Sequence, residues 1–154
     1  MDKTAIEHWS PVIGGHFWWT GLIFVLIFVP LMIFFGSKIS SKQRDIVLYG
    51  MGIYQLGNKA LTQIGYIFSD NYIMASNLPL HLCGLSGILA GIVVFYRKQI
   101  LFEFLYFFGL VGFIHSVLTP EFTGGVSSWK IFDYYVGHSM SVSYTHLRAH
   151  ETVE

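Results

Sequence analysis

Hydrophobic residues are concentrated in long segments that are separated by short polar stretches. The apolar segments cover residues 20–35, 46–68, 78–96 and 100–118, and a further one begins near Trp129. An α-helix rises about 1.5 Å per residue, so roughly 20 apolar residues cross the hydrocarbon core of a bilayer. The pattern therefore predicts an all-α fold, a polytopic transmembrane helix bundle with about five spans.

The segment 78–96 has a polar end followed by a face suited to close packing. His81 and the only cysteine of the chain, Cys83, lie near its start, and small residues recur along the rest. Small residues allow two helix backbones to approach closely in lipid, so we expect this helix at the centre of the bundle. His81 lies about 200° around the helix from Cys83. A histidine that activates Cys83 must therefore come from another segment.

The segment 46–68 is the least apolar one. Its polar residues recur at helical spacing and form one stripe: Gln55, Asn58, Lys59, Thr62 and Gln63. An unpaired lysine in lipid costs about 3 kcal/mol. The stripe must therefore face protein or water.

Charge predicts the orientation in the membrane. The loops at residues 37–44 and 97–99 are basic, whereas the other two contain Asp70 and Glu121. The positive-inside rule then predicts a multi-pass protein of the cell membrane with its N-terminus outside. Polar residues from several segments would share the outer half of the bundle, and they predict an outward-facing polar pocket.

Composition supports a membrane protein whose partners are membrane lipids. Hydrophobic residues make up 53% of the chain and charged residues only 12%, against about 25% charged residues in soluble domains. The formal net charge is zero, which gives no reason to expect a nucleic-acid partner. No pattern predicts a cofactor, and a single cysteine excludes an internal disulfide.

The last residues break the pattern of the fifth span. Residues 143–154 are polar where the span should still be crossing lipid, and they resemble translated adapter or vector sequence. We therefore expect residues 1–142 to form a transmembrane domain that is incomplete at its C-terminus, and residues 143–154 to be a non-native tail. His146 and His150 in this tail lack the glutamate of the zinc-protease motif, and no metal site is predicted from them.

Three motifs carry a resemblance to a known family. They are LPLHLCGLS at residues 78–86, the run FEFLYFFGLVGFIHSVLTPE at residues 102–121, and YVGHS at residues 135–139. With these motifs the chain resembles the bacterial YwaF-like integral membrane proteins, which are similar to the eukaryotic transmembrane-protein-164 family. The resemblance implies a seven-helix fold, of which this chain would hold four spans and part of a fifth. It also implies acyl transfer between phospholipids, with Cys83 and His138 as the catalytic pair.

The chemistry of that pair suits an ester substrate in the membrane. A thiolate attacks an ester carbonyl, and a histidine accepts the thiol proton and returns it to the leaving alkoxide. A free thiol has a pKa of about 8.5 and is mostly protonated at neutral pH, so a paired imidazole is needed. This predicts a phospholipid acyltransferase or a lipid hydrolase. The supporting residues of the pocket would be His81, His115, Ser116, Asn58, Lys59 and Gln63.

Other functions are consistent with the same residues. The polar stripe and the histidines could line the path of a small-solute or proton-coupled transporter. His81, His115 and His138 could together bind zinc. In a non-catalytic membrane protein, the cysteine would pack as a small apolar residue and the histidines would hydrogen-bond between helices. The inner half of the helices is almost purely apolar, which favours a one-sided pocket over a transport path.

Overall fold

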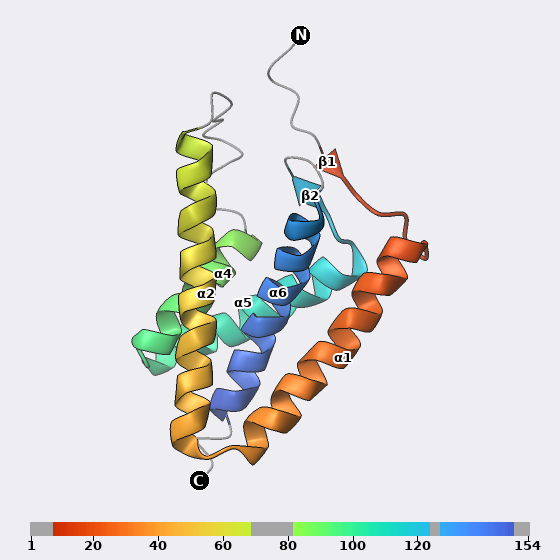
Figure 1. Ribbon diagram of the computed structural model, residues 1–154. Helices are drawn as coiled ribbons and strands as arrows, with labels where there is room; N and C mark the ends of the chain where they lie inside the picture. Colours follow the sequence, from red (N-terminus) through yellow and green to blue (C-terminus); the bar gives the residue numbers. More distant parts are fainter. Residues whose placement is uncertain (1–7, 69–81, 124–126, 150–154) are drawn as a thin grey trace.

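The computed structural model describes residues 8–68, 82–123 and 127–149 (Figure 1). These residues form five helices and one antiparallel pair of two-residue strands. The elements are β1 (His8–Trp9), α1 (His16–Lys38), α2 (Ser41–Ile67), α4 (Leu82–Phe95), α5 (Gln99–Leu118), β2 (Phe122–Thr123) and α6 (Ser128–Ala149). The predicted helical fold is confirmed for this part of the chain, apart from the short pairing of β1 with β2.

Two of the helices, α1 and α5, are long and apolar enough to cross a membrane. Only 17% of the apolar window of α1 and 28% of that of α5 is buried within the structure, unlike the core helix of a soluble protein. The helix α4 is apolar but shorter, and α2 and α6 carry too many polar residues to qualify among the described helices. Two of the five predicted spans are thus supported, and the polytopic bundle stays a prediction.

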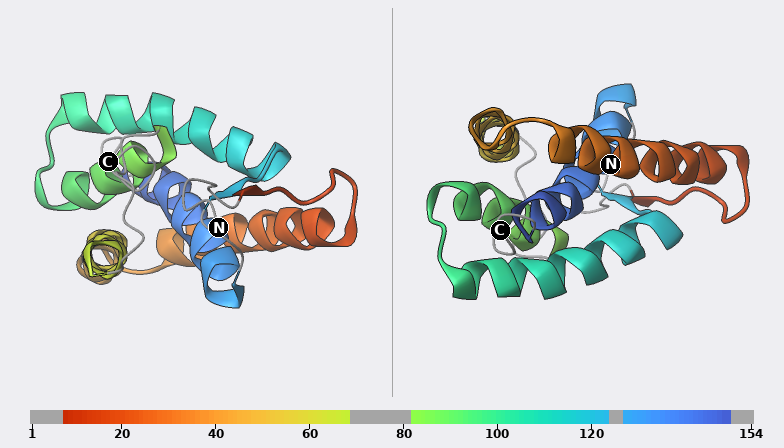
Figure 2. Two further views of the ribbon diagram at one scale, coloured as in Figure 1. Left: turned by 90° about the horizontal axis from the view of Figure 1, so that it is seen from above. Right: turned by 90° about the horizontal axis from the view of Figure 1, so that it is seen from below.

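The helix α6 occupies the centre of the fold. It contacts α1, α2, α4 and α5, and both views of Figure 2 show it running between α1 and α5. Against α1 the approach is close, because a Cβ atom on Gly21 would overlap the ring of Tyr135. Most of the segment expected at the centre forms α4, which packs against α2, α5 and α6.

Helix α2 begins earlier than the apolar pattern predicts. Its N-cap is Ser40, whose hydroxyl accepts a hydrogen bond from the Gln43 backbone, while the Gln43 side chain accepts one from the Ser40 backbone. This reciprocal pair satisfies two N–H groups that a helix start leaves open. The capping pair therefore starts the helix within the polar loop, five residues before the predicted start at residue 46.

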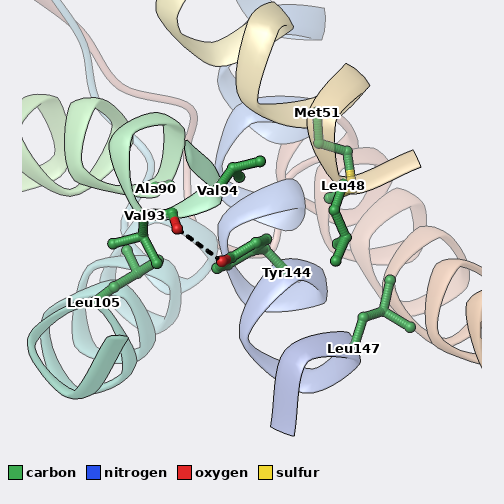
Figure 3. Packing of buried hydrophobic residues seen from close by; sticks show 8 residues of the cluster. All are labelled: Leu48, Met51, Ala90, Val93, Val94, Leu105, Tyr144 and Leu147. Atoms are coloured by element: carbon green, nitrogen blue, oxygen red, sulfur yellow. Dashed lines mark hydrogen bonds between the residues drawn. The ribbon is translucent and has the colours of Figure 1, made fainter. Parts of the chain in front are cut away.

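The helices α2 and α4 pack closely through glycines. A Cβ atom on Gly52 would lie 3.0 Å from Val94, and one on Gly91 would lie 2.5 Å from Leu56 Cγ and 3.3 Å from the Gly52 carbonyl. The main apolar cluster lies beside this contact (Figure 3). It contains Leu48, Met51, Ala90, Val93, Val94, Leu105, Tyr144 and Leu147.

Helix α6 continues past the predicted domain end at residue 142. Ser143 and Thr145 are buried, and their hydroxyls donate to the carbonyls of Ser139 and Val142 in the same helix. Such local bonds satisfy polar side chains without a partner helix. The Tyr144 hydroxyl donates to the Val93 carbonyl of α4 (Figure 3). The polar character of these residues thus does not end the helix, and their non-native origin stays a prediction.

Replacing Gly91 by alanine should destabilise the fold. Alanine gains roughly 1 kcal/mol of helix propensity over glycine, but forcing a methyl group into a packed contact costs about 1–3 kcal/mol. The matched control is Gly57→Ala on α2, where a Cβ atom meets nothing within 4 Å. Thermal unfolding in detergent, followed by circular dichroism, should give a lower midpoint for Gly91→Ala than for Gly57→Ala. Equal midpoints would contradict the close α2–α4 contact.

Candidate functional site

The Cys83 thiol lies in the first turn of α4 and faces α5. Its side chain is half-buried, and a Cβ atom on Gly112 would lie 3.9 Å from the Cys83 Sγ atom. The Ser86 Oγ atom lies at the same distance from that position. The thiol and the Ser86 hydroxyl therefore lie against α5 at Gly112, at a distance of ordinary van der Waals contact.

The side chain of Lys59 extends from α2 to the part of α4 that carries Cys83. Its Cε atom lies 3.3 Å from the position that a Cβ on Gly87 would take, so its aliphatic stem crosses α4 one turn after Cys83. The ammonium group is close enough to the thiol for an electrostatic interaction. A cation near a thiol favours the thiolate. Lys59 is half-buried and makes no ion pair within the part of the chain that the structure describes.

Tyr134 on α6 adjoins both residues of the predicted catalytic pair. Its phenol interacts electrostatically with Cys83, and its ring centroid lies 4.5 Å from that of His138. The hydroxyl of Tyr134 donates to the Ser116 carbonyl over 3.3 Å, which links α6 to α5. The ring also packs against Phe122, with centroids 4.6 Å apart. Aromatic side chains thus surround one end of the site.

The half-buried imidazole of His138 is oriented by its own helix. Its Nδ1 atom lies 2.6 Å from the Tyr134 carbonyl oxygen. A carbonyl only accepts hydrogen bonds, so Nδ1 carries the proton and Nε2 is the basic nitrogen of the neutral ring. Between these two described side chains, no hydrogen bond joins the Cys83 thiol to His138. The structure therefore gathers the predicted pair around Tyr134 without direct contact.

The predicted supporting residues are distributed unequally. Ser116 is only 1% exposed, and its hydroxyl donates to the Phe113 carbonyl over 2.7 Å. Its single proton is therefore used within α5. His115 is exposed and lies beside Thr119, whereas Gln63 is half-buried near the end of α2. His81 lies outside the described residues.

The polar stripe of α2 faces α6. Gln55 is 4% exposed, and its Nε2 atom donates to the Gly137 carbonyl over 2.7 Å. Asn58 donates from Nδ2 to the carboxylate of Asp133. The prediction that the stripe faces protein or water is confirmed for these two residues. Their amides are bonded to α6, so both residues contribute to the contact between the two helices, and a transport path stays a prediction.

Asp133 is the residue that the sequence analysis missed. Its Oδ1 atom accepts hydrogen bonds from the Tyr54 hydroxyl, over 2.9 Å, and from Asn58. The signal was an acid in the predicted fifth span, because a carboxylate at membrane depth needs partners. The polar stripe of α2 offered those partners, but the sequence did not show which helix it faces.

Around Cys83, the described residues form no cluster of metal-binding side chains. Within residues 8–68, 82–123 and 127–149, no three side chains of the metal-binding types His, Cys, Asp and Glu come together. Two small cavities lie elsewhere, one beside Gln55 and Met140 and one beside Arg97 and Phe102. The predicted outward-facing pocket therefore stays a prediction.

Comparison with known proteins gives a family. No curated protein and no solved structure matches the chain. The resemblance to bacterial YwaF-like proteins in particular stays a prediction. The model of the TMEM164 family matches residues 7–150, which contain every described helix and extend past the predicted domain end. A match over nearly the whole length shows that this chain belongs to the TMEM164 family.

Proposed function

We propose that this protein transfers acyl groups between membrane phospholipids through a thioester on Cys83. The observation that supports the proposal best is the position of the thiol, between Gly112 of α5 and the ammonium group of Lys59. Burial disfavours the charged thiolate, so a half-buried thiol needs help to ionise, and a neighbouring cation and a histidine base can supply that help. The apolar surfaces of α1 and α5 favour a substrate that is dissolved in the membrane.

In the first step the Cys83 thiolate attacks the carbonyl carbon of a phospholipid ester. The sulfur–carbon bond forms, and the ester carbon–oxygen bond breaks with its electron pair on the departing oxygen. His138, which has accepted the thiol proton, gives that proton to the oxygen, and a lysophospholipid leaves. Lys59 stabilises the thiolate before the attack, so the thiol gives its proton to His138 more readily.

His138 acts as the base through Nε2, because Nδ1 is bonded to the Tyr134 carbonyl. Catalytic hydrogen bonds often shorten only when the substrate is bound, so the present separation from Cys83 is compatible with this role. Tyr134 adjoins both groups, and its ring packs against that of His138 at an interplanar angle of 45°. The arrangement leaves Nε2 to exchange the proton with sulfur and with the leaving oxygen.

In the second step the hydroxyl of another lysophospholipid attacks the thioester. His138 accepts the hydroxyl proton as the new ester carbon–oxygen bond forms. The sulfur–carbon bond breaks with its electron pair on sulfur, and His138 returns the proton to sulfur. Water at the same position would give hydrolysis instead. Phe122 is 4% exposed and packs on Tyr134 and on Trp9, whose ring centroid is 5.5 Å away. These aromatic rings limit access of water, which favours transfer over hydrolysis.

The same proposal includes the orientation predicted from charge, with the N-terminus outside the cell membrane. Phe122 and Trp9 then belong to the outer side, and the ends of helices joined by basic loops belong to the inner side. Arg97 forms an ion pair with Asp45 at this inner end. The thiol would act on lipids of the outer leaflet.

Replacing Cys83 by alanine should abolish acyl exchange. In vesicles that contain labelled phosphatidylcholine and a lysophospholipid acceptor, exchange should fall to the rate without protein, since no other thiol exists in the chain. The protein with Cys83 intact should gain the mass of one acyl group. Neutral hydroxylamine should remove that acyl group from the thioester. The thermal unfolding midpoint serves as the folding control. Unchanged exchange in Cys83→Ala would rule out the thioester mechanism.

Replacing His138 by alanine should slow exchange by about 100- to 10,000-fold, the usual contribution of a general acid–base group. The matched control is His16→Ala, since His16 is exposed at the start of α1 and distant in sequence from the site residues. Initial rates at pH 7 distinguish the two variants. Equal rates for both would remove His138 from the mechanism.

The orientation can be measured with single cysteines in a Cys83→Ala background. Val12 is 80% exposed before α1, and Lys42 is exposed in the basic loop. A membrane-impermeant maleimide added to intact cells should label Val12→Cys and leave Lys42→Cys unlabelled until the cells are opened. The reverse pattern would place the N-terminus inside.

A further inference from the structure

Asp133 ties α2 to α6 beside the proposed site. Its Oδ1 atom accepts one hydrogen bond from the Tyr54 hydroxyl and one from the Asn58 amide. The two donors lie one turn apart on α2, so they hold the carboxylate from both sides. Hydrogen bonds to an ionised acceptor are about twice as strong as neutral ones. We call Tyr54, Asn58 and Asp133 the carboxylate clamp.

The clamp determines where Lys59 lies. Consecutive residues of a helix point about 100° apart, so Asn58 faces α6 while Lys59 faces α4. The Lys59 Cε atom meets the Gly87 position there at 3.3 Å. A shift of α2 by one residue would move the ammonium group by about 1.5 Å along the axis and rotate it away from α4. The effect of the Lys59 ammonium group on the Cys83 thiolate depends on the distance between the two charges.

The clamp also fixes the part of α6 that adjoins the thiol. Asp133 directly precedes Tyr134, the residue that interacts with Cys83 and whose ring packs against that of His138. Gln55 adds a second bond between the same helices one turn further along, to the Gly137 carbonyl. The site residues of α2 and α6 are therefore held by one set of polar contacts.

We propose that Asp133 is a positioning residue of the Cys83 site, because the carboxylate clamp holds the Lys59 ammonium group close to the thiol. The catalytic use of this positioning rests on the proposed function. Its test uses the reactivity of the thiol itself, which is measured without any lipid substrate.

The sign of the effect distinguishes positioning from direct charge. The Asp133 carboxylate is negative, so its removal would by charge alone favour the thiolate. Loss of the Lys59 position has the opposite effect, because a cation moves away from sulfur. The described charged group that acts on the thiol is Lys59 from α2. Tyr134 from α6 is the described titratable side chain near it, and α5 presents Gly112.

The experiment is alkylation of Cys83 by iodoacetamide in the reconstituted protein between pH 6 and 10. Cys83 is the only cysteine of the chain, so the rate reports one site. Asp133→Ala should react about tenfold more slowly than the unmodified protein at pH 7, and its half-maximal rate should move to higher pH. Lys59→Met should do the same. The double variant should be no slower than Lys59→Met alone, since both act through one ammonium group.

Conservative variants and a control complete the test. Asp133→Asn retains an acceptor oxygen for both donors, so it should react at close to the unmodified rate. If Asp133 acted only through its charge, this variant would change the rate. Tyr54→Phe removes one donor, should give an intermediate rate, and serves if Asp133→Ala does not fold. The control is Asp45→Asn, which removes the negative charge of the ion pair with Arg97 about 20 Å away toward the start of α2. It should leave the rate unchanged.

Two results would overturn the positioning role. One is alkylation of Asp133→Ala or Tyr54→Phe at or above the unmodified rate at pH 7. The other is a double variant that is slower than Lys59→Met by the full factor of Asp133→Ala, because the two residues would then act independently. Acyl exchange by Cys83→Ala would overturn only the proposed function. The alkylation rates would still test the positioning role independently.

Discussion

Polar side chains that lie inside an apolar helical assembly must find partners within it, and this requirement organises the fold. Tyr54, Gln55 and Asn58 on α2 find theirs on α6, at Asp133 and at the Gly137 carbonyl. An unpaired carboxylate or amide there would lose its hydration without compensation. The paired groups therefore fix the rotation and the register of α2 against α6, which apolar contacts alone leave less strictly defined.

Close backbone approach is the second condition for the site. Glycines at positions 52 and 91 bring α2 against α4, and the Cys83 thiol faces α5 at Gly112. Between helices in lipid, close contact supplies much of the attraction, since water exclusion is absent. The consequence is chemical as well as structural, because the stem of Lys59 can cross α4 at Gly87 and place a cation near sulfur.

Membership of the TMEM164 family and the arrangement around Cys83 bear on function in different ways. The family match establishes what kind of chain this is, and the two apolar helices are consistent with association with a membrane. The reaction has to be argued from the side chains. The proposed acyl transfer relies on a thiol with a neighbouring cation, a phenol and an oriented imidazole, with the rings of Phe122 and Trp9 packed together at one end.

The sequence by itself determined the helical segments, the polar stripe of α2 and the candidate thiol, because apolar runs and three- and four-residue spacings are local properties of the chain. Only the tertiary structure decided which helix the stripe faces, that Asp133 is its partner, and that Ser116 is buried while its neighbour His115 is exposed. It also decided that α6 continues to Ala149 through a polar segment. Periodicity shows which residues share a face of a helix. The neighbour of that face depends on how several helices pack together, which no single segment encodes.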